Sequence, residues 1–141
     1  MLQQALKLCK DVAPNVNLPL VCSKLVSAGF YTGVVELCVA CASKLDPQDK
    51  AVYYYKSDQP SQDREGHLMY YRRMEIYREV CVALERLYER SSDANTSTTQ
   101  SDANHTLTSA DSNYQGRQLV WDCLCRDDEL LHVAVYEWLV S

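Results

Sequence analysis

The sequence predicts an all-α fold, an irregular α-helical solenoid of about six to seven antiparallel helices with one long disordered linker. Apolar residues recur at helical spacing along most of the chain. Only four Gly and four Pro interrupt 141 residues, whereas all-β folds need many turns. A hydrophobic content of 47% is enough for a packed core. Because no repeat of fixed length is visible, we expect an irregular stack, and we treat residues 1–141 as a single fragment of it.

The first half of the chain predicts three helices. Residues 1–12 form an amphipathic pattern that stops before Pro14. Asn17 is a suitable N-cap for a second helix, in whose first turn a proline costs no hydrogen bond, and Gly29 is a suitable C′ residue. The third helix, Tyr31–Leu45, is apolar on nearly every side, so we expect it to be the central helix of the fragment.

A short helix over residues 49–56 and a long helix from Asp63 to about Arg90 follow, separated by a loop over residues 57–62. β-propensity would allow a strand at the first of these, but no partner strand is visible. The long helix carries a seam at alternating steps of four and three. Its members are Tyr70, Met74, Tyr77, Cys81, Leu84 and Tyr88. Oppositely charged residues three apart, such as Arg72 and Glu75, contribute only a few tenths of a kcal/mol per pair, so we expect them to form a solvated face.

The segment Ser91–Asn113 consists of Ser, Thr, Asn, Asp, Gln and Ala, apart from one His and one Leu. Such a composition buries too little apolar area to offset its ordering entropy, so we predict a disordered linker. Helical periodicity resumes near Tyr114, and a last helix follows Asp127, the predicted N-cap. The chain begins and ends inside apolar helical patterns, which leads us to expect an excised piece of a longer solenoid.

Charge and cysteine usage argue against several classes of function. The net charge of −5, with dispersed basic residues, disfavours direct nucleic-acid binding, which relies on Lys and Arg. No signal peptide and no apolar run of about 18 residues is visible, so a reducing compartment is expected. The C-x-x-C of Cys38 and Cys41 lacks a second ligand pair, and no Gly-rich turn offers an oxyanion site. We therefore predict no enzyme activity, no catalytic residues, no metal, no cofactor and no small-molecule substrate.

Aromatic residues mark a candidate protein-interaction surface. Ten tyrosines exceed what a core of this size needs, and Tyr is enriched at interfaces because it combines a large apolar area with a polar tip. Placement at the rim of the core is an equally good interpretation of the same residues. The candidate surface consists of Tyr53, Tyr54, Tyr55, Tyr70, Tyr71 and Trp138.

Several runs resemble a known family. These are Leu-Pro-Leu-Val-Cys at 18–22, Phe-Tyr-Thr-Gly-Val-Val-Glu-Leu-Cys at 30–38, Asp-Pro at 46–47, Tyr-Tyr-Tyr-Lys at 53–56 before Pro60, Asp-Glu-Leu-Leu at 128–131 and Tyr-Glu-Trp-Leu at 136–139. In order and spacing, they resemble the C-terminal solenoid of the large inner-ring scaffold nucleoporins of the nuclear pore complex, the 155-kilodalton type. The resemblance covers about residues 1–90 and 113–141.

The resemblance implies a structural constituent of the inner ring that supports pore assembly and transport of protein and mRNA between nucleus and cytoplasm. Other inner-ring nucleoporins, including their linker segments, would be the partners, and the location would be the nuclear pore at the nuclear envelope. Membrane contact in that family belongs to a β-propeller that this chain lacks. Two alternatives from other classes are a free-standing helical adaptor unrelated to the pore and a small thiol or zinc enzyme.

Overall fold

The computed structural model describes residues 2–13, 15–96 and 109–141, with side chains except at residues 2, 90–96 and 109–113. Within these residues the chain forms seven α-helices and no strand, which confirms the predicted all-α class. The helices are α1 (Leu2–Val12), α2 (Leu18–Ser27), α3 (Tyr31–Leu45), α4 (Lys50–Lys56), α5 (Arg64–Thr96), α6 (Ser109–Cys125) and α7 (Glu129–Val140).

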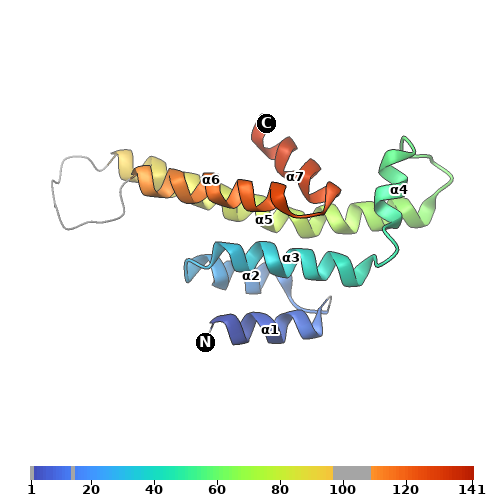
Figure 1. Ribbon diagram of the computed structural model, residues 1–141, viewed down its shortest axis with the longest axis horizontal. Helices are drawn as coiled ribbons and strands as arrows, with labels where there is room; N and C mark the ends of the chain where they lie inside the picture. Colours follow the sequence, from blue (N-terminus) through green and yellow to red (C-terminus); the bar gives the residue numbers. More distant parts are fainter. Residues whose placement is uncertain (1, 14, 97–108) are drawn as a thin grey trace.

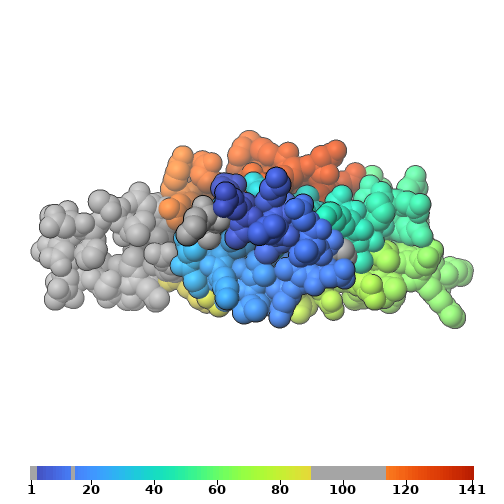
Figure 2. All heavy atoms as spheres, turned by 90° about the horizontal axis from the view of Figure 1, so that it is seen from below, coloured from blue at the N-terminus to red at the C-terminus, as the bar shows by residue number. Residues whose placement is uncertain are grey.

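The helices stack in layers around α5, as a solenoid does (Figure 1). Helix α6 runs back along α5, α2 and α3 form the next layer, and α1 lies outside them. Helix α7 crosses α5 from the opposite side, and α4 packs against one end of α5. Seen from below, α1 covers the middle of the molecule (Figure 2). Helix α5 contacts α2, α3, α4, α6 and α7, so the central position predicted for the third helix is shared between α3 and α5.

The turns of the first half follow the predicted local chemistry. Asn17 is the N-cap of α2, and its Oδ1 accepts a hydrogen bond from the backbone N–H of Leu20 at 3.4 Å. Gly29 has φ +78°, the left-handed conformation that ends α2 without a Cβ penalty. A Cβ at Gly33 would lie 3.1 Å from the ring of Phe30, so that ring packs directly on α3. These contacts confirm the tight turn between α2 and α3.

Three helix boundaries differ from the prediction. The N-cap of α7 is Asp128, not Asp127, because Asp128 has the extended backbone and its Oδ1 accepts the N–H of Leu131 at 3.2 Å. Helix α5 continues to Thr96, and α6 already begins at Ser109, so both helices reach into the segment predicted as a linker. The rest of that segment, residues 97–108, and Pro14 lie outside the described residues.

The buried stripe of α5 is rotated by about one residue from the predicted seam. Tyr77 and Leu84 of that seam are buried, but its other four members are only half-buried. The fully covered positions repeat at steps of four and three and begin with a charged residue, which explains why apolar periodicity misplaced the stripe. They are Arg73, Tyr77, Val80, Leu84 and Leu87, and Ala83, next to Leu84, is buried as well.

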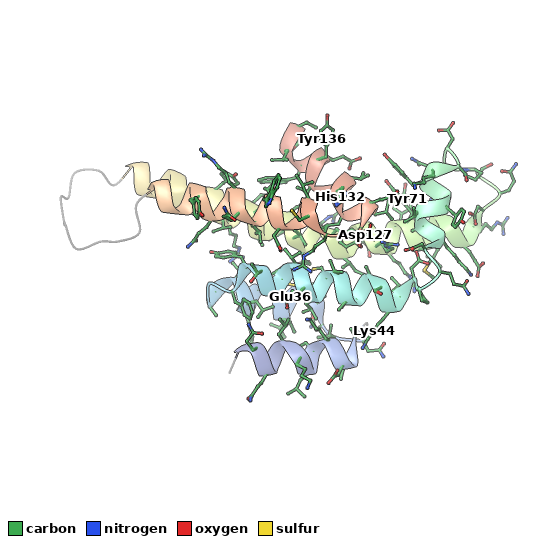
Figure 3. The ribbon with its side chains drawn as sticks, in the orientation of Figure 1. Glu36, Lys44, Tyr71, Asp127, His132 and Tyr136 are labelled. Carbon is green, nitrogen blue, oxygen red and sulfur yellow. The ribbon has the colours of Figure 1, made fainter. Side chains whose placement is uncertain are left out.

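Ion pairs join different helices instead of lying along α5. Lys10 pairs with Glu36 between α1 and α3 at 3.2 Å, and Lys50 pairs with Glu65 between α4 and α5 at 3.1 Å. Lys44 of α3 donates to the last carbonyl oxygens of α1; Lys44 and Glu36 are labelled in Figure 3. Among the described side chains, Arg72 and Glu75 form no ion pair within 4 Å, and both are exposed. This agrees with the solvated face predicted for them, because such exposed pairs contribute only a few tenths of a kcal/mol and do not hold long side chains in place.

Candidate protein-binding groove

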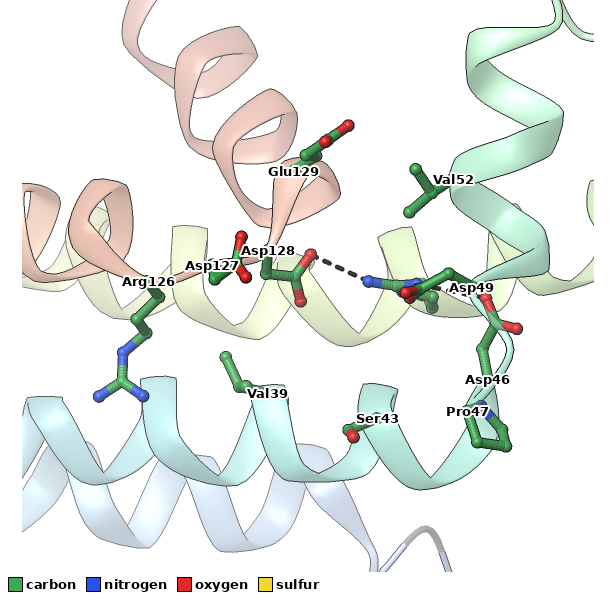
Figure 4. A pocket seen from close by; sticks show the side chains of 11 residues that line it. Val39, Ser43, Asp46, Pro47, Asp49, Val52, Arg126, Asp127, Asp128 and Glu129 are labelled. Atoms are coloured by element: carbon green, nitrogen blue, oxygen red, sulfur yellow. Dashed lines mark hydrogen bonds and ion pairs between the residues drawn. The ribbon is translucent and has the colours of Figure 1, made fainter.

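A buried arginine lies where three helix ends meet. The side chain of Arg73, on α5, is 4% exposed. Its Nη1 donates to Oδ2 of Asp46 at 3.2 Å and to Oδ1 of Asp49 at 3.1 Å. Its Nη2 donates to Oδ1 of Asp128 at 2.9 Å (Figure 4). The same Nη2 also donates to the hydroxyl of Tyr77 at 3.2 Å. We call these five residues the Arg73 network.

The carboxylates of the Arg73 network also cap helices. Asp46 ends α3, and its two oxygens accept the first backbone N–H groups of α4, from Lys50 at 2.9 Å and from Ala51 at 3.0 Å. Asp128 caps α7 in the same way. A single guanidinium therefore ties the end of α3 and the starts of α4 and α7 to the first third of α5. Removing one partner from such a buried set costs about 3–5 kcal/mol.

The protonation states of the network are fixed by burial and by its own charges. Burial alone lowers the pKa of Arg73, but Tyr77, Asp128 and Asp46 together raise that pKa above its ordinary value. Burial raises the pKa of Tyr77, and the adjacent carboxylate of Asp128 raises it further. The phenol therefore stays protonated and donates to Oδ2 of Asp128. Nε of Arg73 has no hydrogen-bond partner among the described atoms.

A pocket of about 310 Å³ opens beside the Arg73 network (Figure 4). Five carboxylates and two arginines line it, and the network already uses three of those carboxylates and one of the arginines. Within the described residues, no group of three or more His, Cys, Asp or Glu side chains is arranged to hold a metal ion. The charged groups that the pocket shares with the Arg73 network join helix ends to one another.

The predicted tyrosines separate into different environments. Tyr53 is 72% exposed, whereas Tyr54 is 6% exposed and packs against the rings of His67 and Tyr70. Tyr55 stacks on Tyr70 with ring centroids 5.8 Å apart and an interplanar angle of 11°. Tyr71, 55% exposed and labelled in Figure 3, meets Tyr70 edge-on at 5.6 Å.

His67 belongs to this aromatic cluster and was missed by sequence reasoning. Its ring lies 4.5 Å from that of Tyr71 and 5.6 Å from that of Tyr54. The signal that could have found it is helical spacing, because His67 precedes Tyr70 and Tyr71 by three and four residues on α5.

Tyr70, Tyr71 and Trp138 come together in one groove between α5 and α7, which we call the α5–α7 groove. Its volume is about 530 Å³. Where the two helices contact each other, Sγ of Cys81 on α5 lies 3.7 Å from the carbonyl oxygen of Ala134 on α7. The lining residues are Gln59, Tyr70, Tyr71, Met74, Glu75, Arg78 and Cys81, together with Ala134, Glu137, Trp138 and Ser141.

Trp138 of α7 is fixed by contacts with α5. Its ring lies 5.6 Å from that of Tyr88, and its Nε1 donates to Oε1 of Glu85 at 3.4 Å. Both partners belong to α5, so the indole is fixed between the two helices. Three of the six residues predicted as an interaction surface therefore line the α5–α7 groove, and the two helices that carry them are joined by the Arg73 network.

The two cysteines of the C-x-x-C motif, on α3, lie in the hydrophobic core. A hydrogen bond with Cys22 and burial raise the pKa of Cys38, and burial raises the pKa of Cys41 to about 11. Both thiols are therefore protonated at neutral pH, the state in which a thiol is a poor nucleophile. In the described part of the chain, no helix has both the length and the apolar character needed to cross a bilayer.

A layered stack of helices with charged joints inside and an aromatic groove outside defines a helical scaffold protein. Over residues 1–141 the chain matches the family described as "Non-repetitive/WGA-negative nucleoporin C-terminal", and it belongs to that family. It is 34% identical over 161 aligned residues to the nuclear pore complex protein Nup154 of Drosophila melanogaster. That alignment covers 100% of this chain but only 11% of Nup154, so the chain spans about a tenth of this relative.

The fold is similar to a crystal structure of a variant of the C-terminal domain of Nup170 from Chaetomium thermophilum. The TM-score is 0.75 with 25% sequence identity, and the match covers 99% of this chain and 24% of that chain. The irregular solenoid predicted from periodicity and from the resemblance is thereby confirmed.

Proposed function

We propose that this chain is a scaffold segment of the nuclear pore complex at the nuclear envelope. It supports pore assembly and nucleocytoplasmic transport by stacking helices and by binding other nucleoporins. The observation that carries the proposal is the family match over all 141 residues, together with the likeness to a solved nucleoporin domain. We place the segment in the inner ring, with membrane contact made outside this chain.

The role proposed is structural and not catalytic. The most deeply buried charged groups, Arg73 and Asp46, are engaged in holding helix ends. Such joints give a stacked array a defined geometry, because each helix pair in a solenoid contacts only its neighbours. A net charge of −5 supports partners other than nucleic acid.

The α5–α7 groove is the surface that we propose for binding linker segments of other nucleoporins. Short segments dock in grooves through apolar and aromatic anchors, and this groove presents Tyr70, Tyr71 and Trp138 along with Met74. The volume of about 530 Å³ falls within the range of about 300–1,000 Å³ over which ligand sites form.

A pull-down with purified linker segments of inner-ring nucleoporins tests the proposal. The bait is the 141-residue chain, and the control bait is the full C-terminal half of the protein. We expect both baits to retain at least one linker segment. Retention by the full C-terminal half but not by this chain would refute binding through this segment.

A further inference from the structure

An unpaired carboxylate lies in the α5–α7 groove. Glu137 is exposed on α7, and among the described residues it makes no ion pair within 4 Å and no side-chain hydrogen bond. Its charge acts on groups that line the groove. After burial, the charge of Glu137 is the next largest cause of the raised pKa of Tyr70, and it also raises the pKa of Cys81. An uncompensated negative charge therefore lies among aromatic and apolar groups.

The other charged groups of the groove leave it acidic. Glu75 and Arg78 line the same space, and neither forms an ion pair within 4 Å among the described side chains. Together with Glu137 they give two negative charges and one positive charge. A cationic ligand is therefore favoured over an anionic one.

The aromatic walls are held in place before any ligand arrives. Tyr70 is fixed by stacking with Tyr55 and by edge contact with Tyr71. On the α7 side, Trp138 is fixed by Tyr88 and Glu85. Side chains that are already ordered lose little entropy on binding, so this groove is pre-organised for a ligand.

A carboxylate beside aromatic rings matches a guanidinium group. A planar guanidinium stacks on aromatic faces and bonds a carboxylate through two parallel N–H groups. The apolar side chains of Met74 and Ala134 in the same groove can cover its alkyl stem. We infer that the α5–α7 groove binds an arginine side chain of a partner polypeptide, with Glu137 as the counter-charge and Trp138 and Tyr71 as stacking surfaces. This inference rests on the proposed function, for which it names the anchor residue of the linker.

Tryptophan fluorescence offers a direct test. The chain has two tryptophans, and Trp121 is exposed on α6 outside the groove, so Trp121→Phe makes Trp138 the single reporter. The probe is an acetylated and amidated peptide, Gly-Ser-Leu-Arg-Leu-Ser-Gly. Its matched control carries citrulline, which keeps the shape of arginine but lacks the charge. We expect the arginine peptide to change Trp138 emission in a saturable way and to bind roughly five- to tenfold more tightly than the citrulline peptide.

Substitutions in the chain provide the second arm. Glu137→Gln should abolish the preference for arginine over citrulline, whereas Glu89→Gln, an exposed glutamate of α5 outside the groove, should leave it unchanged. Circular dichroism establishes that each variant keeps its helices. Equal affinity for the two peptides, or a preference that survives Glu137→Gln, would overturn the inference. The inference would also be overturned if the 141-residue chain bound the arginine peptide but a longer form of the protein did not, because another segment of the same protein would then occupy the groove.

The pull-down with linker segments separates this inference from the proposed function. If linkers are retained equally by the parent chain and the Glu137→Gln variant, the arginine anchor is refuted while the scaffold proposal stands. If the full C-terminal half retains linkers and the chain retains none, the proposed binding function fails, whatever the short peptides do. Retention that falls about fivefold or more with Glu137→Gln and not with Glu89→Gln supports both.

Discussion

Nη2 of Arg73 donates a hydrogen bond to Oδ1 of Asp128 over 2.9 Å, and the two side chains are only 4% and 9% exposed. The contact joins the first third of α5 to the N-cap of α7, between residues 55 positions apart in the sequence. Because α7 supplies one wall of the α5–α7 groove, this ion pair sets the position of that wall. The stability of the fold and the geometry of the groove are therefore coupled through one buried contact.

Replacing Arg73 with Met should lower the free energy of unfolding by about 3–5 kcal/mol, because buried carboxylates lose their counter-charge. Arg72→Met is the matched control, since Arg72 is the adjacent residue but is exposed, and its loss should change stability by no more than about 0.5 kcal/mol. Urea unfolding followed by circular dichroism measures both. Equal effects of the two substitutions would mean that the Arg73 network does not stabilise the fold.

Asp128→Ala and Asp127→Ala should differ strongly although the residues are neighbours. Asp128 caps α7 and pairs with Arg73, whereas Asp127 is exposed. Loss of a helix cap costs about 1 kcal/mol, and the unpaired guanidinium adds to that. The Asp127 variant should stay within about 0.5 kcal/mol of the parent. Thermal melts compare the two, and a larger loss for Asp127→Ala would place the cap at the wrong residue.

Gly66→Ala should destabilise the joint between α4 and α5. A Cβ at Gly66 would lie 2.4 Å from Oδ2 of Asp63 and 2.7 Å from Cβ of Tyr54, and neither gap accepts a carbon atom. Overpacking of this kind costs about 1–3 kcal/mol. Near-ultraviolet circular dichroism should change as well, because Tyr54 packs against the rings of His67 and Tyr70.

The control for this change is Gly29→Ala, where a Cβ meets nothing within 4 Å and only the φ of +78° is strained. It should cost about 1–2 kcal/mol and leave the tyrosine signal unaltered. A Gly66→Ala variant with the aromatic signal of the parent would argue against close packing of α4 on α5.

Stability should fall at alkaline pH in part through Cys123. Burial, followed by the charge of Asp122, raises the pKa of this fully buried thiol from 9.0 to about 12. A group whose pKa is raised by folding contributes stability below its unfolded pKa, and that contribution is lost as the pH rises. Between about pH 9 and pH 12 this thiol should lower the free energy of unfolding by about 1.4 kcal/mol per pH unit.

The difference in slope between the parent and Cys123→Ala isolates the contribution of this thiol from those of other groups that titrate at high pH. Denaturant unfolding at several pH values from 8 to 11 supplies both slopes. Cys125→Ala, an exposed position on the same helix, is the control and should keep the parent slope. Parallel slopes for the parent and Cys123→Ala would show that the thiol titrates alike in the folded and unfolded chains.

The tyrosine run at 53–55 illustrates what the sequence can and cannot predict. β-Propensity allowed a strand there, but the lack of a visible partner strand favoured a short helix, which α4 confirms. Successive residues on a helix point in directions about 100° apart, so three tyrosines in a row cannot share one environment. Which of them is buried depends on how α4 packs against α5, where Gly66 lies against Tyr54 and Arg73 bonds Asp49, 24 residues away in the sequence.

The two adjacent arginines, Arg72 and Arg73, show the same limit. Helix existence followed from the spacing of apolar residues, but apolar periodicity treats any arginine as a surface residue. Arg73 is buried only because carboxylates from the loops before α4 and α7 converge on it. Those partners lie 24 to 55 residues away, so their convergence is a property of the fold and not of any local pattern.

Site-specific photo-crosslinking in the full-length protein tests most directly whether the α5–α7 groove binds nucleoporins. A photoreactive phenylalanine analogue replaces Tyr71 in the groove or, as the matched control, Tyr53, which is more exposed but lies outside it. After irradiation of cells, crosslinked proteins are identified by mass spectrometry. We predict a nucleoporin crosslinked at Tyr71 and none at Tyr53. A groove position that crosslinks no nucleoporin, or the same nucleoporin at both positions, would contradict binding through this groove.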